Sequence, residues 1–465
     1  MDIYQLYASR HDYPDLDYDK AAEHLSQAIR CRTVSHVDTA ETDQSQFERL
    51  HQLIRENYPF IMKNAACKTF GNSLLIELSG SDKTLKPAMF IAHQDVVPVI
   101  ESTVRKWIHD PFSGDISAGF IWGRGSLDIK EMLIGFLEAA EYLLSKGTKF
   151  ARTVYLAFGE DEETVGSGAK AICRYLLSEG VELEFVWDES GKIRDGKTYG
   201  APAITVGEIG MYEKGYADFA FRTRSTGGHS SLPFYGTSLG NLATAINAVV
   251  SEKRPGSLSE TIKESLRILQ PFITEEPLVS LVRNIDENEE AILEYFLADP
   301  ELFALAATTK APTMITPGAP AANVMPGDME AVINYRMVPG DTIESLQQHY
   351  RSLLPDNVEV TFLRGVIASR ASRHDSFGFR SLVRALNRYY PDVVFIPSAN
   401  TAATDGHNYE PVCSCVLRFT PFLEDNAIKA EGIHGTNERL SIRAFQQGLR
   451  VIVRMMEISC LKQAK

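Results

Sequence analysis

Polar residues with metal-ligating or acid–base side chains follow several apolar runs of this chain. The segment FGEDEETVGSG places four acids at 160–163, directly after the run TVYLAF. The run AMFIA leads into HQD at 93–95, and EFVW leads into DE at 188–189. His434 follows the run CSCVLRF in the segment EGIHGTNERLSI, and Asp128 stands where the glycine-rich GRGSLDIKEM opens a helix.

Histidine and carboxylate together, without converging cysteines, suit borderline-to-hard divalent metals such as zinc, manganese or cobalt. Two metals about 3.5–4 Å apart would need a bridging carboxylate, and three ligand carboxylates with a hydroxide would balance two dications. Each signal also has a simpler interpretation. A histidine followed by an acid can be a surface pair, and acids after a strand can be a solvated helix start.

The elements that must position these residues are short buried strands alternating with helices. Candidate strands cover 88–92, 153–158 and 184–187, and amphipathic helical patterns lie between them. This alternation predicts an α/β fold with a mainly parallel sheet sandwiched by helices. In such sheets, sites form outside the carboxyl ends of the strands, so the polar clusters should meet at one edge.

The pattern changes near residue 207 and returns near residue 366. KGYADFAFRTRS alternates apolar and polar residues like a half-exposed antiparallel strand, and strand–helix–strand patterns follow it. We therefore expect a metal-binding catalytic domain from 1–206 and 366–465. A smaller two-layer α/β domain at 207–365 would be inserted into it, with an additional mostly helical insertion at about 255–310.

The net charge and the cysteine content indicate which partners and which compartment to expect. A chain of 465 residues with a net charge of −14 and scattered basic residues does not favour nucleic acid or an anionic membrane as a partner. Six cysteines in so long a chain do not suggest a disulfide framework, and buried thiols in a reducing compartment are expected. The N-terminal segment lacks the pattern of a signal peptide, and no apolar run is long enough to span a membrane. A cytoplasmic enzyme is the resulting expectation.

The motifs HQD, GRGSLDIK, DEE, WDE, GGHSSLP, NV and GIHG occur in this order along the chain. In this order and spacing the chain closely resembles the dinuclear-metal exopeptidase and deacylase family. That family includes acetylornithine deacetylase, succinyl-diaminopimelate desuccinylase, aminoacylase and carboxypeptidases. The segment KWIHDPFSGDISAGFIWGRGSLDIK most resembles its carboxypeptidase S and glycine-X carboxypeptidase branch.

The resemblance implies two divalent metal ions, with zinc favoured and cobalt or manganese as alternatives. His93 and Asp188 would bind one metal, Glu163 and His434 the other, and Asp128 would bridge them. Two further residues would support the reaction without binding metal. Asp95 would orient the imidazole two residues before it, and Glu162 would be the general base.

The resemblance also implies roles for residues of the inserted domain, which would act as a lid and dimerisation domain. His229, in GGHSS, would stabilise the oxyanion, in many relatives across a homodimer interface. Asn323 and Arg336 would bind the substrate carboxylate. Near the last strand, ANTAATDGHNYE keeps Thr404 of a substrate loop but has Gly406-His407 where a small residue and arginine are frequent.

The implied reaction is metal-dependent hydrolysis of an amide bond beside a free carboxylate. The substrate would be a small peptide, cleaved by a carboxypeptidase or dipeptidase, or alternatively an N-acyl amino acid, cleaved by an aminoacylase-like deacylase. A non-catalytic binding protein of the same fold is a remote alternative.

Overall fold

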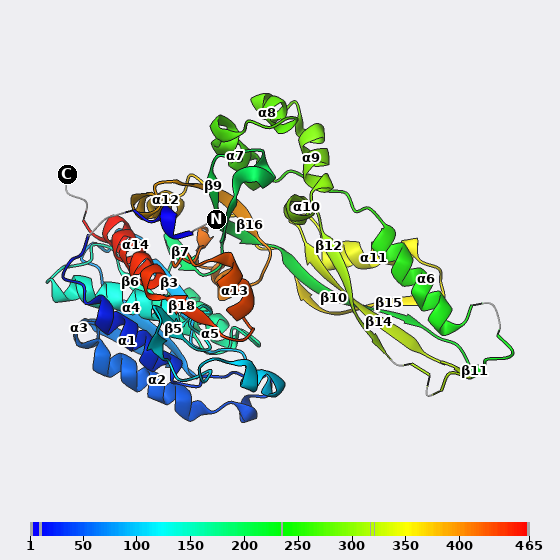
Figure 1. Ribbon diagram of the computed structural model, residues 1–465, viewed down its shortest axis with the longest axis horizontal. Coiled ribbons are helices and arrows are strands. Elements are labelled where there is room, and N and C mark those ends of the chain that lie inside the picture. The colour runs from blue at the N-terminus through cyan, green and yellow to red at the C-terminus, as the bar shows by residue number, and fades with distance from the viewer. Residues whose placement is uncertain (1–2, 9–11, 234–235, 317, 320, 463–465) are drawn as a thin grey trace. The chain divides into compact units, whose positions relative to one another are not determined.

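The apolar runs that precede the polar clusters form the centre of a nine-stranded sheet (Figure 1). The computed structural model describes residues 3–8, 12–233, 236–316, 318–319 and 321–462. In it β3 (Ala88–His93) lies between β6 (Val154–Gly159) and β7 (Phe185–Asp188) and pairs with both in parallel. β17 (Val416–Arg418) continues in parallel beside β7.

The flanking strands are largely antiparallel. The complete order is β1-β2-β6-β3-β7-β17-β9-β16, with β8 paired to β9. The additional strands are β1 (Ala65–Phe70), β2 (Ser73–Leu78), β8 (Lys192–Asp195), β9 (Thr205–Glu213) and β16 (Val393–Asn400). The α/β class is confirmed, but the sheet is mixed, with a parallel centre and antiparallel strands on both sides.

Helices cover both faces of this sheet because its crossovers run in opposite directions. α4 (Lys130–Ser145) connects β3 to β6, and α5 (Ser167–Ser178) connects β6 back across β3 to β7. Right-handed crossovers in opposite directions place these two helices on opposite faces. The remaining helices of this part are α1 (Tyr18–Ile29), α2 (Gln44–Asn57), α3 (Pro59–Asn64), α12 (Phe377–Tyr389), α13 (Asn426–Gly432) and α14 (Ile442–Cys460).

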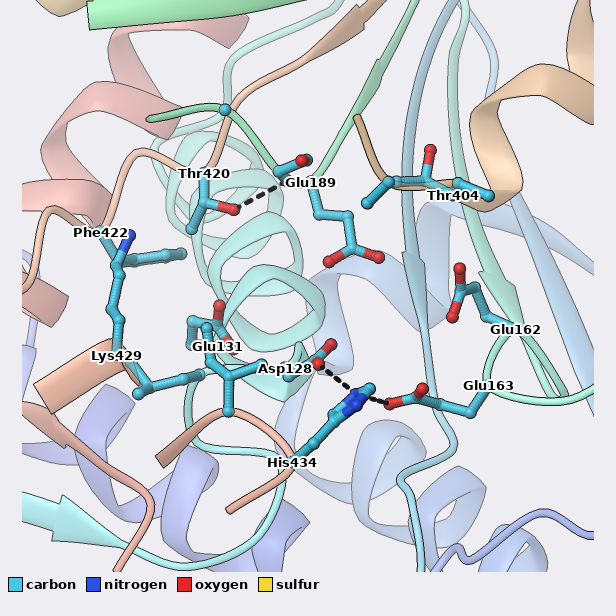
Figure 2. Close-up of a pocket in the computed structure, with 16 residues that line it drawn as sticks. Asp128, Glu131, Glu162, Glu163, Glu189, Thr404, Thr420, Phe422, Lys429 and His434 are labelled. Carbon is cyan, nitrogen blue, oxygen red and sulfur yellow. Dashed lines mark hydrogen bonds and ion pairs between the residues drawn. The ribbon is translucent and has the colours of Figure 1, made fainter. Parts of the chain in front are cut away.

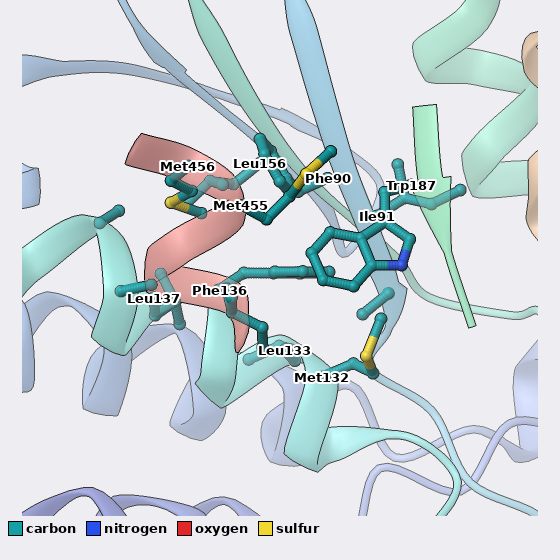
Figure 3. Packing of buried hydrophobic residues seen from close by; sticks show 14 of the residues in the cluster. Phe90, Ile91, Met132, Leu133, Phe136, Leu137, Leu156, Trp187, Met455 and Met456 are labelled. Carbon is teal, nitrogen blue, oxygen red and sulfur yellow. The ribbon is translucent and has the colours of Figure 1, made fainter. Parts of the chain in front are cut away.

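Large aromatic side chains fill the core between α4 and the sheet (Figure 3). The rings of Phe90, Phe136 and Trp187 meet edge to face, with centroids 5.4 to 6.0 Å apart. Met455 and Met456 of α14 pack into the same cluster. The strand ends that carry the polar clusters therefore start from a rigid, close-packed base.

The chain divides into two compact units. The first comprises residues 1–197, 202–211 and 371–465, and the second comprises 198–201 and 212–370. The first unit also contains a small sheet of β18 (Arg439–Ser441), β5 (Phe120–Trp122) and β4 (Ile116–Ser117).

The second unit is built on a four-stranded antiparallel sheet in the order β12-β14-β10-β15. These strands are β12 (Thr309–Thr316), β14 (Met329–Met337), β10 (Gly215–Thr223) and β15 (Val358–Val366). Residues of α6 (Ser238–Ser251) and α11 (Ile343–Leu353) share its hydrophobic core. The alternation of buried and half-buried residues is clear in β14, whereas β10, in the sheet interior, is buried along most of its length.

Four helices and a small ribbon complete the second unit. The helices lie within 255–310 and are α7 (Glu260–Leu269), α8 (Leu278–Leu281), α9 (Glu289–Ala298) and α10 (Pro300–Ala306). β11 (Gly228–His229) and β13 (Val324–Met325) form a two-stranded ribbon. No helix of the described residues is both long and apolar enough to span a membrane. All six cysteines are free thiols, and all except Cys67 are buried.

Truncation of the aromatic core should destabilise the first unit. Phe136→Ala removes a fully buried ring and should lower the free energy of unfolding by about 3–5 kcal/mol, because it leaves a cavity between α4 and the sheet. Phe60→Ala is the matched control, since Phe60 is 44% exposed. Urea unfolding followed by circular dichroism should separate the two variants. Equal unfolding midpoints would contradict this account of the core.

Candidate active site

The carboxyl ends of the central strands open into a pocket of about 370 Å³ in the first unit (Figure 2). His93 ends β3 and stands opposite Gly159, the last residue of β6, in the parallel register. The acid loop after β6 and the segment after β7 reach the same pocket. Its lining residues are Leu127, Asp128, Glu131, Glu162, Glu163, Glu189, Ser190, Gly191, Ala402, Ala403, Thr404, Thr420, Phe422, Lys429, Ile433 and His434.

Asp128 lies between two imidazoles. Its Oδ1 is 3.2 Å from Nε2 of His93, and its Oδ2 is 3.0 Å from Nε2 of His434. Oε1 of Glu163 is 3.2 Å from the same His434 nitrogen. Burial opposes ionisation of Asp128, but hydrogen bonds from His434 and His93 outweigh it and hold its pKa below the ordinary value. One carboxylate thus faces two histidines that are far apart in the sequence.

The loop that carries Asp128 is held by a second buried carboxylate. Oε1 of Glu438 accepts hydrogen bonds from the backbone amides of Gly125 and Leu127, and its Oε2 is 2.6 Å from Nη1 of Arg124. Because Glu438 is four residues from His434, this contact fixes the two halves of the site to each other. No motif in the sequence marks Glu438 as a residue of the site.

Asp95 joins the first histidine to the acid loop. Nδ1 of His93 donates to the backbone oxygen of Asp95 at 2.9 Å and lies 3.4 Å from its carboxylate. The two carboxylate oxygens accept the backbone amides of Glu162 and Glu163, each at 3.2 Å, and one also accepts the hydroxyl of Ser35. Asp95 therefore positions the histidine and the two acids at once.

The four consecutive acids have different surroundings. Glu160 accepts the amide of Asn72, and Asp161 accepts the amides of Ser167 and Gly168, where it caps the start of α5. Glu162 and Glu163 instead line the pocket. Burial raises the pKa of Glu162 well above its ordinary value, with nearby acids adding to the effect.

Asp188, the last residue of β7, and Glu189, which follows it, have different surroundings. The carboxylate of Asp188 turns to the backbone, where it accepts the amides of Gly406 and Glu189 at 2.7 and 2.8 Å. Glu189 points into the pocket (Figure 2), with Oε1 3.5 Å from Nε2 of His93. Glu189 therefore lies beside His93, and the role of Asp188 as a metal ligand stays a prediction.

Two further pocket residues were missed by the sequence analysis. Glu131 follows Asp128 by three residues, and neither of its carboxylate oxygens has a hydrogen-bond partner within the described residues. Burial raises the pKa of Glu131 well above its ordinary value. Lys429 reaches the pocket from α13. The sequence carried little signal for either residue, because each lies in an ordinary helical pattern.

Residues 402–404, in the loop that follows β16, line the same pocket. Thr404 is buried, lines the pocket and caps the short helical turn at Asp405–Tyr409. Asp405 packs against the end of β6, where a Cβ on Gly159 would lie 2.4 Å from Oδ2 of Asp405. Only glycine at the last position of β6 leaves room for this carboxylate.

The candidate residues of the second unit, His229, Asn323 and Arg336, lie in two separate parts of that unit. His229 pairs with Val324 in the β11–β13 ribbon, and the oxygen of Asn323 accepts the amide of Ser230, so His229 and Asn323 lie close together. Nδ1 of His229 accepts a hydrogen bond from the amide of Ser231 at 3.1 Å, which leaves Nε2 facing outward.

Arg336 lies on β14 of the four-stranded sheet, at the end away from the ribbon. It pairs with Tyr216, seven strand residues from the Thr223–Met329 pair that precedes the ribbon. At about 3.4 Å per residue this distance is roughly 24 Å. Its guanidinium carbon is 4.9 Å from the ring centre of Tyr216. Within one chain, Arg336 and Asn323 therefore cannot contact the same small carboxylate.

The pocket residues fit divalent metal ions. Ligand atoms of His93, Asp128 and Glu163 lie within 4.8 Å of one another, as do those of His93, Glu162 and Glu189. Five carboxyl groups line the pocket against one lysine, so the site has an excess of negative charge that cations would balance. Nitrogen and oxygen donors of this kind suit zinc, manganese or cobalt. An α/β sheet with such a pocket at its strand ends is the arrangement of a metal-dependent hydrolase.

Comparison with known proteins identifies the family. Residues 89–458 match the model of peptidase family M20/M25/M40. The chain is 33% identical to probable carboxypeptidase S-like 2 of Dictyostelium discoideum, over 92% of this chain and 82% of that protein. It is 31% identical to the N-fatty-acyl-amino acid synthase/hydrolase PM20D1 of Mus musculus, over 94% of this chain and 87% of the relative.

The fold is shared with a solved structure. An M20 family metallo-carboxypeptidase from Sulfolobus solfataricus has the same fold, with a TM-score of 0.69 and 16% identity over 95% of this chain and 99% of that chain. The chain belongs to peptidase family M20/M25/M40 and is a metallopeptidase-type hydrolase, as the motifs predicted. Enzymes of this family use divalent metals.

Removal of the Asp95 carboxylate should weaken metal binding. Asp95→Ala frees the amides of Glu162 and Glu163 and removes the carboxylate beside His93, so affinity for Mn²⁺ or Zn²⁺ should fall about 10- to 100-fold. Calorimetric titration of the metal-free protein measures this loss. Glu160→Ala, in which an acid of the adjacent loop outside the pocket is removed, should bind metal like the wild type. Equal affinities of the two variants would contradict the role of Asp95.

Proposed function

We propose that this protein is a carboxypeptidase or dipeptidase that uses a dinuclear metal centre, with zinc as the favoured metal, to cleave small peptides beside a free carboxylate. The observation that carries the proposal is Asp128, whose two oxygens face the Nε2 atoms of His93 and His434. A carboxylate in this position is suited to bridge two metals.

The ligand set that we propose differs in one residue from the sequence-based expectation. His93 and Glu189 would hold one metal, Glu163 and His434 the other, and Asp128 would be shared. Asp188 would support the site from behind, because its carboxylate is hydrogen-bonded to backbone amides. When bound, two such ions polarise a carbonyl and lower the pKa of a water molecule.

The residues of the chain would then carry the proton and hold the substrate. Glu162 would take the proton of the attacking water and return it to the leaving amine. Its neighbour Glu163 would be occupied as a ligand, and the Asp95 hydrogen bonds to both amides would hold Glu162 in place. Thr404 would contact the substrate from the loop before β17.

The second unit would act as a lid and dimerisation domain. The outward Nε2 of His229 would donate a hydrogen bond to the developing oxyanion. Arg336 and Asn323 would both bind the substrate carboxylate, and their separation along the sheet favours contributions from two copies of the chain. A homodimer would supply His229 and Asn323 from one protomer and Arg336 from the other.

The second candidate function is hydrolysis of N-acyl amino acids. It is favoured by the similarity to a relative named N-fatty-acyl-amino acid synthase/hydrolase. Both reactions cleave an amide beside a carboxylate, so they differ in the group on the acyl side of the bond.

A small substrate panel tests the proposed function. Wild-type protein should hydrolyse Gly-Leu and Gly-Phe faster than N-acetyl-Met, and a chelator should abolish this until metal is restored. Glu162→Gln should lower kcat by about 10²- to 10⁴-fold with unchanged metal content, because it removes the proton carrier and leaves the ligands intact. Faster cleavage of N-acetyl-Met would favour the deacylase. Hydrolysis that resists both chelator and Glu162→Gln would contradict the proposed mechanism.

The role of the second unit has a separate test. His229→Ala should lower kcat about 10²- to 10³-fold, as expected for loss of an oxyanion donor, with metal content unchanged. His349→Ala, at a half-buried histidine of this unit that pairs with Glu252, should leave kcat unchanged. If His229 acts across a dimer, mixing His229→Ala with Glu162→Gln protomers should restore activity. Loss of metal in His229→Ala would show that the assignment is wrong.

A further inference from the structure

A cluster of polar side chains surrounds Arg336 on the four-stranded sheet of the second unit. This sheet places β10 between β14 and β15 (Figure 1). Ala217 and Tyr335 belong to the hydrophobic core of the unit, so their sequence neighbours lie on the opposite face of the sheet. The cluster on that face consists of Tyr216, Asp218, Asn334, Arg336 and Arg364.

Asp218 is the carboxylate at the centre of this cluster. Its Oδ2 accepts hydrogen bonds from the hydroxyl of Tyr216 at 2.5 Å and from Nε of Arg364 at 2.8 Å. Its Oδ1 accepts a hydrogen bond from the side-chain amide of Asn334 at 2.8 Å. Burial opposes ionisation of Asp218, but these hydrogen bonds outweigh it and hold its pKa below the ordinary value. Asp218 is therefore an ionised carboxylate whose charge is balanced by Arg364.

Arg336 lies within reach of the same carboxylate but does not pair with it. In the antiparallel register Arg336 stands opposite Tyr216. Asp218, two residues further along β10, is its diagonal neighbour, at a separation of about 7–8 Å that a long side chain can span. Within the described part of the chain no carboxylate pairs with Arg336. Its guanidinium carbon instead lies 4.9 Å from the ring centre of Tyr216.

Arg364 approaches the carboxylate from the other side of β10. It stands opposite Asp218 in the register of β10 and β15. Its Nη2 also donates a hydrogen bond to the hydroxyl of Tyr216 at 3.2 Å, and its guanidinium carbon is 5.8 Å from the centre of that ring. Two guanidiniums therefore flank one tyrosine, one from β14 and one from β15, and the one from β15 holds the carboxylate.

We propose that Arg364 is a positioning residue that keeps Asp218 away from Arg336, so that the guanidinium of Arg336 stays free for the carboxylate of the substrate. The inference rests on the proposed function, in which Arg336 binds that carboxylate. Without Arg364, the ionised Asp218 would attract the neighbouring guanidinium, and substrate would have to displace it. The ring of Tyr216 gives the unpaired guanidinium a favourable surface until substrate binds. Arg364 itself contacts no substrate and acts through Arg336.

The test removes Arg364, and then the charge that it balances, in the metal-loaded enzyme. Arg364→Met should raise KM for Gly-Phe about 10-fold, because Asp218 then pairs with Arg336. It should change kcat for Gly-Phe, and kcat/KM for Gly-Phe-amide, less than about threefold, since neither depends on a free carboxylate being captured. The double variant Arg364→Met/Asp218→Asn should return KM to within about threefold of the wild type, because no charge is left to pair with Arg336.

Arg373→Met is the matched control. Arg373 is 80% exposed, compared with 76% for Arg364, and it likewise pairs with an aspartate, Asp375. Its loss should leave KM for Gly-Phe unchanged. An unchanged KM in Arg364→Met would overturn the proposal. So would a raised KM that Asp218→Asn does not restore, because Arg364 would then act on the fold of the sheet or on the substrate directly.

A crystal structure of Arg364→Met provides a readout that needs no turnover. It should show the carboxylate of Asp218 within about 4 Å of the guanidinium of Arg336, the distance of an ion pair. An Arg336 that keeps its place over Tyr216 in this variant would contradict the proposal. If the wild type cleaves neither peptide, the proposed function fails, and this structure still decides whether Arg364 keeps Asp218 from Arg336.

Discussion

The site depends on one constraint, which is that the Asp128 carboxylate must lie between two histidines from opposite ends of the chain. Glu438 makes this possible because it accepts two amides of the Asp128 loop and pairs with Arg124, and Arg124 in turn donates to the backbone of Gly432 and Gly435. A buried ion pair of this kind, with backbone hydrogen bonds to both partners, is costly to break. It therefore fixes the Asp128 loop against the segment that carries His434.

Several further carboxylates lie in the pocket around Asp128. Acids that are buried together repel one another when ionised, and burial raises the pKa of Glu131, Glu162 and Glu189. Divalent cations would remove this repulsion and restore the ionised forms. The backbone reduces it further at Asp95 and Asp188, whose carboxylates accept hydrogen bonds from backbone amides.

Much of the site could be predicted from the sequence because strand ends of a parallel sheet meet at one edge. That rule predicted that His93, the acid run at 160–163 and His434 would meet at one edge, with Asp128 beside them. Only the resemblance to the family gave Glu162 and Glu163 roles that differ from those of their neighbours. The rule could not choose between Asp188 and Glu189. Neighbouring residues at a strand end point to opposite sides, and the choice depends on the amide of Gly406, which is 218 residues away. Contacts of this range leave no local pattern.

The sequence also could not show that Arg336 and Asn323 are separated. Thirteen residues can form a tight turn or an extended strand, and here most of them form β14. The strand directions of the large sheet were predicted less well at its edges, where antiparallel strands flank the parallel centre. Their short, mixed patterns are compatible with either direction, because strand direction is decided by pairing and not by local preference.

The pocket must meet two opposing electrostatic demands. It needs many carboxylates to hold cations and position a proton carrier, and it must also admit a substrate that is itself an anion. Divalent cations held by these acids would resolve this conflict, because they lower the negative charge that an anionic substrate meets in the pocket.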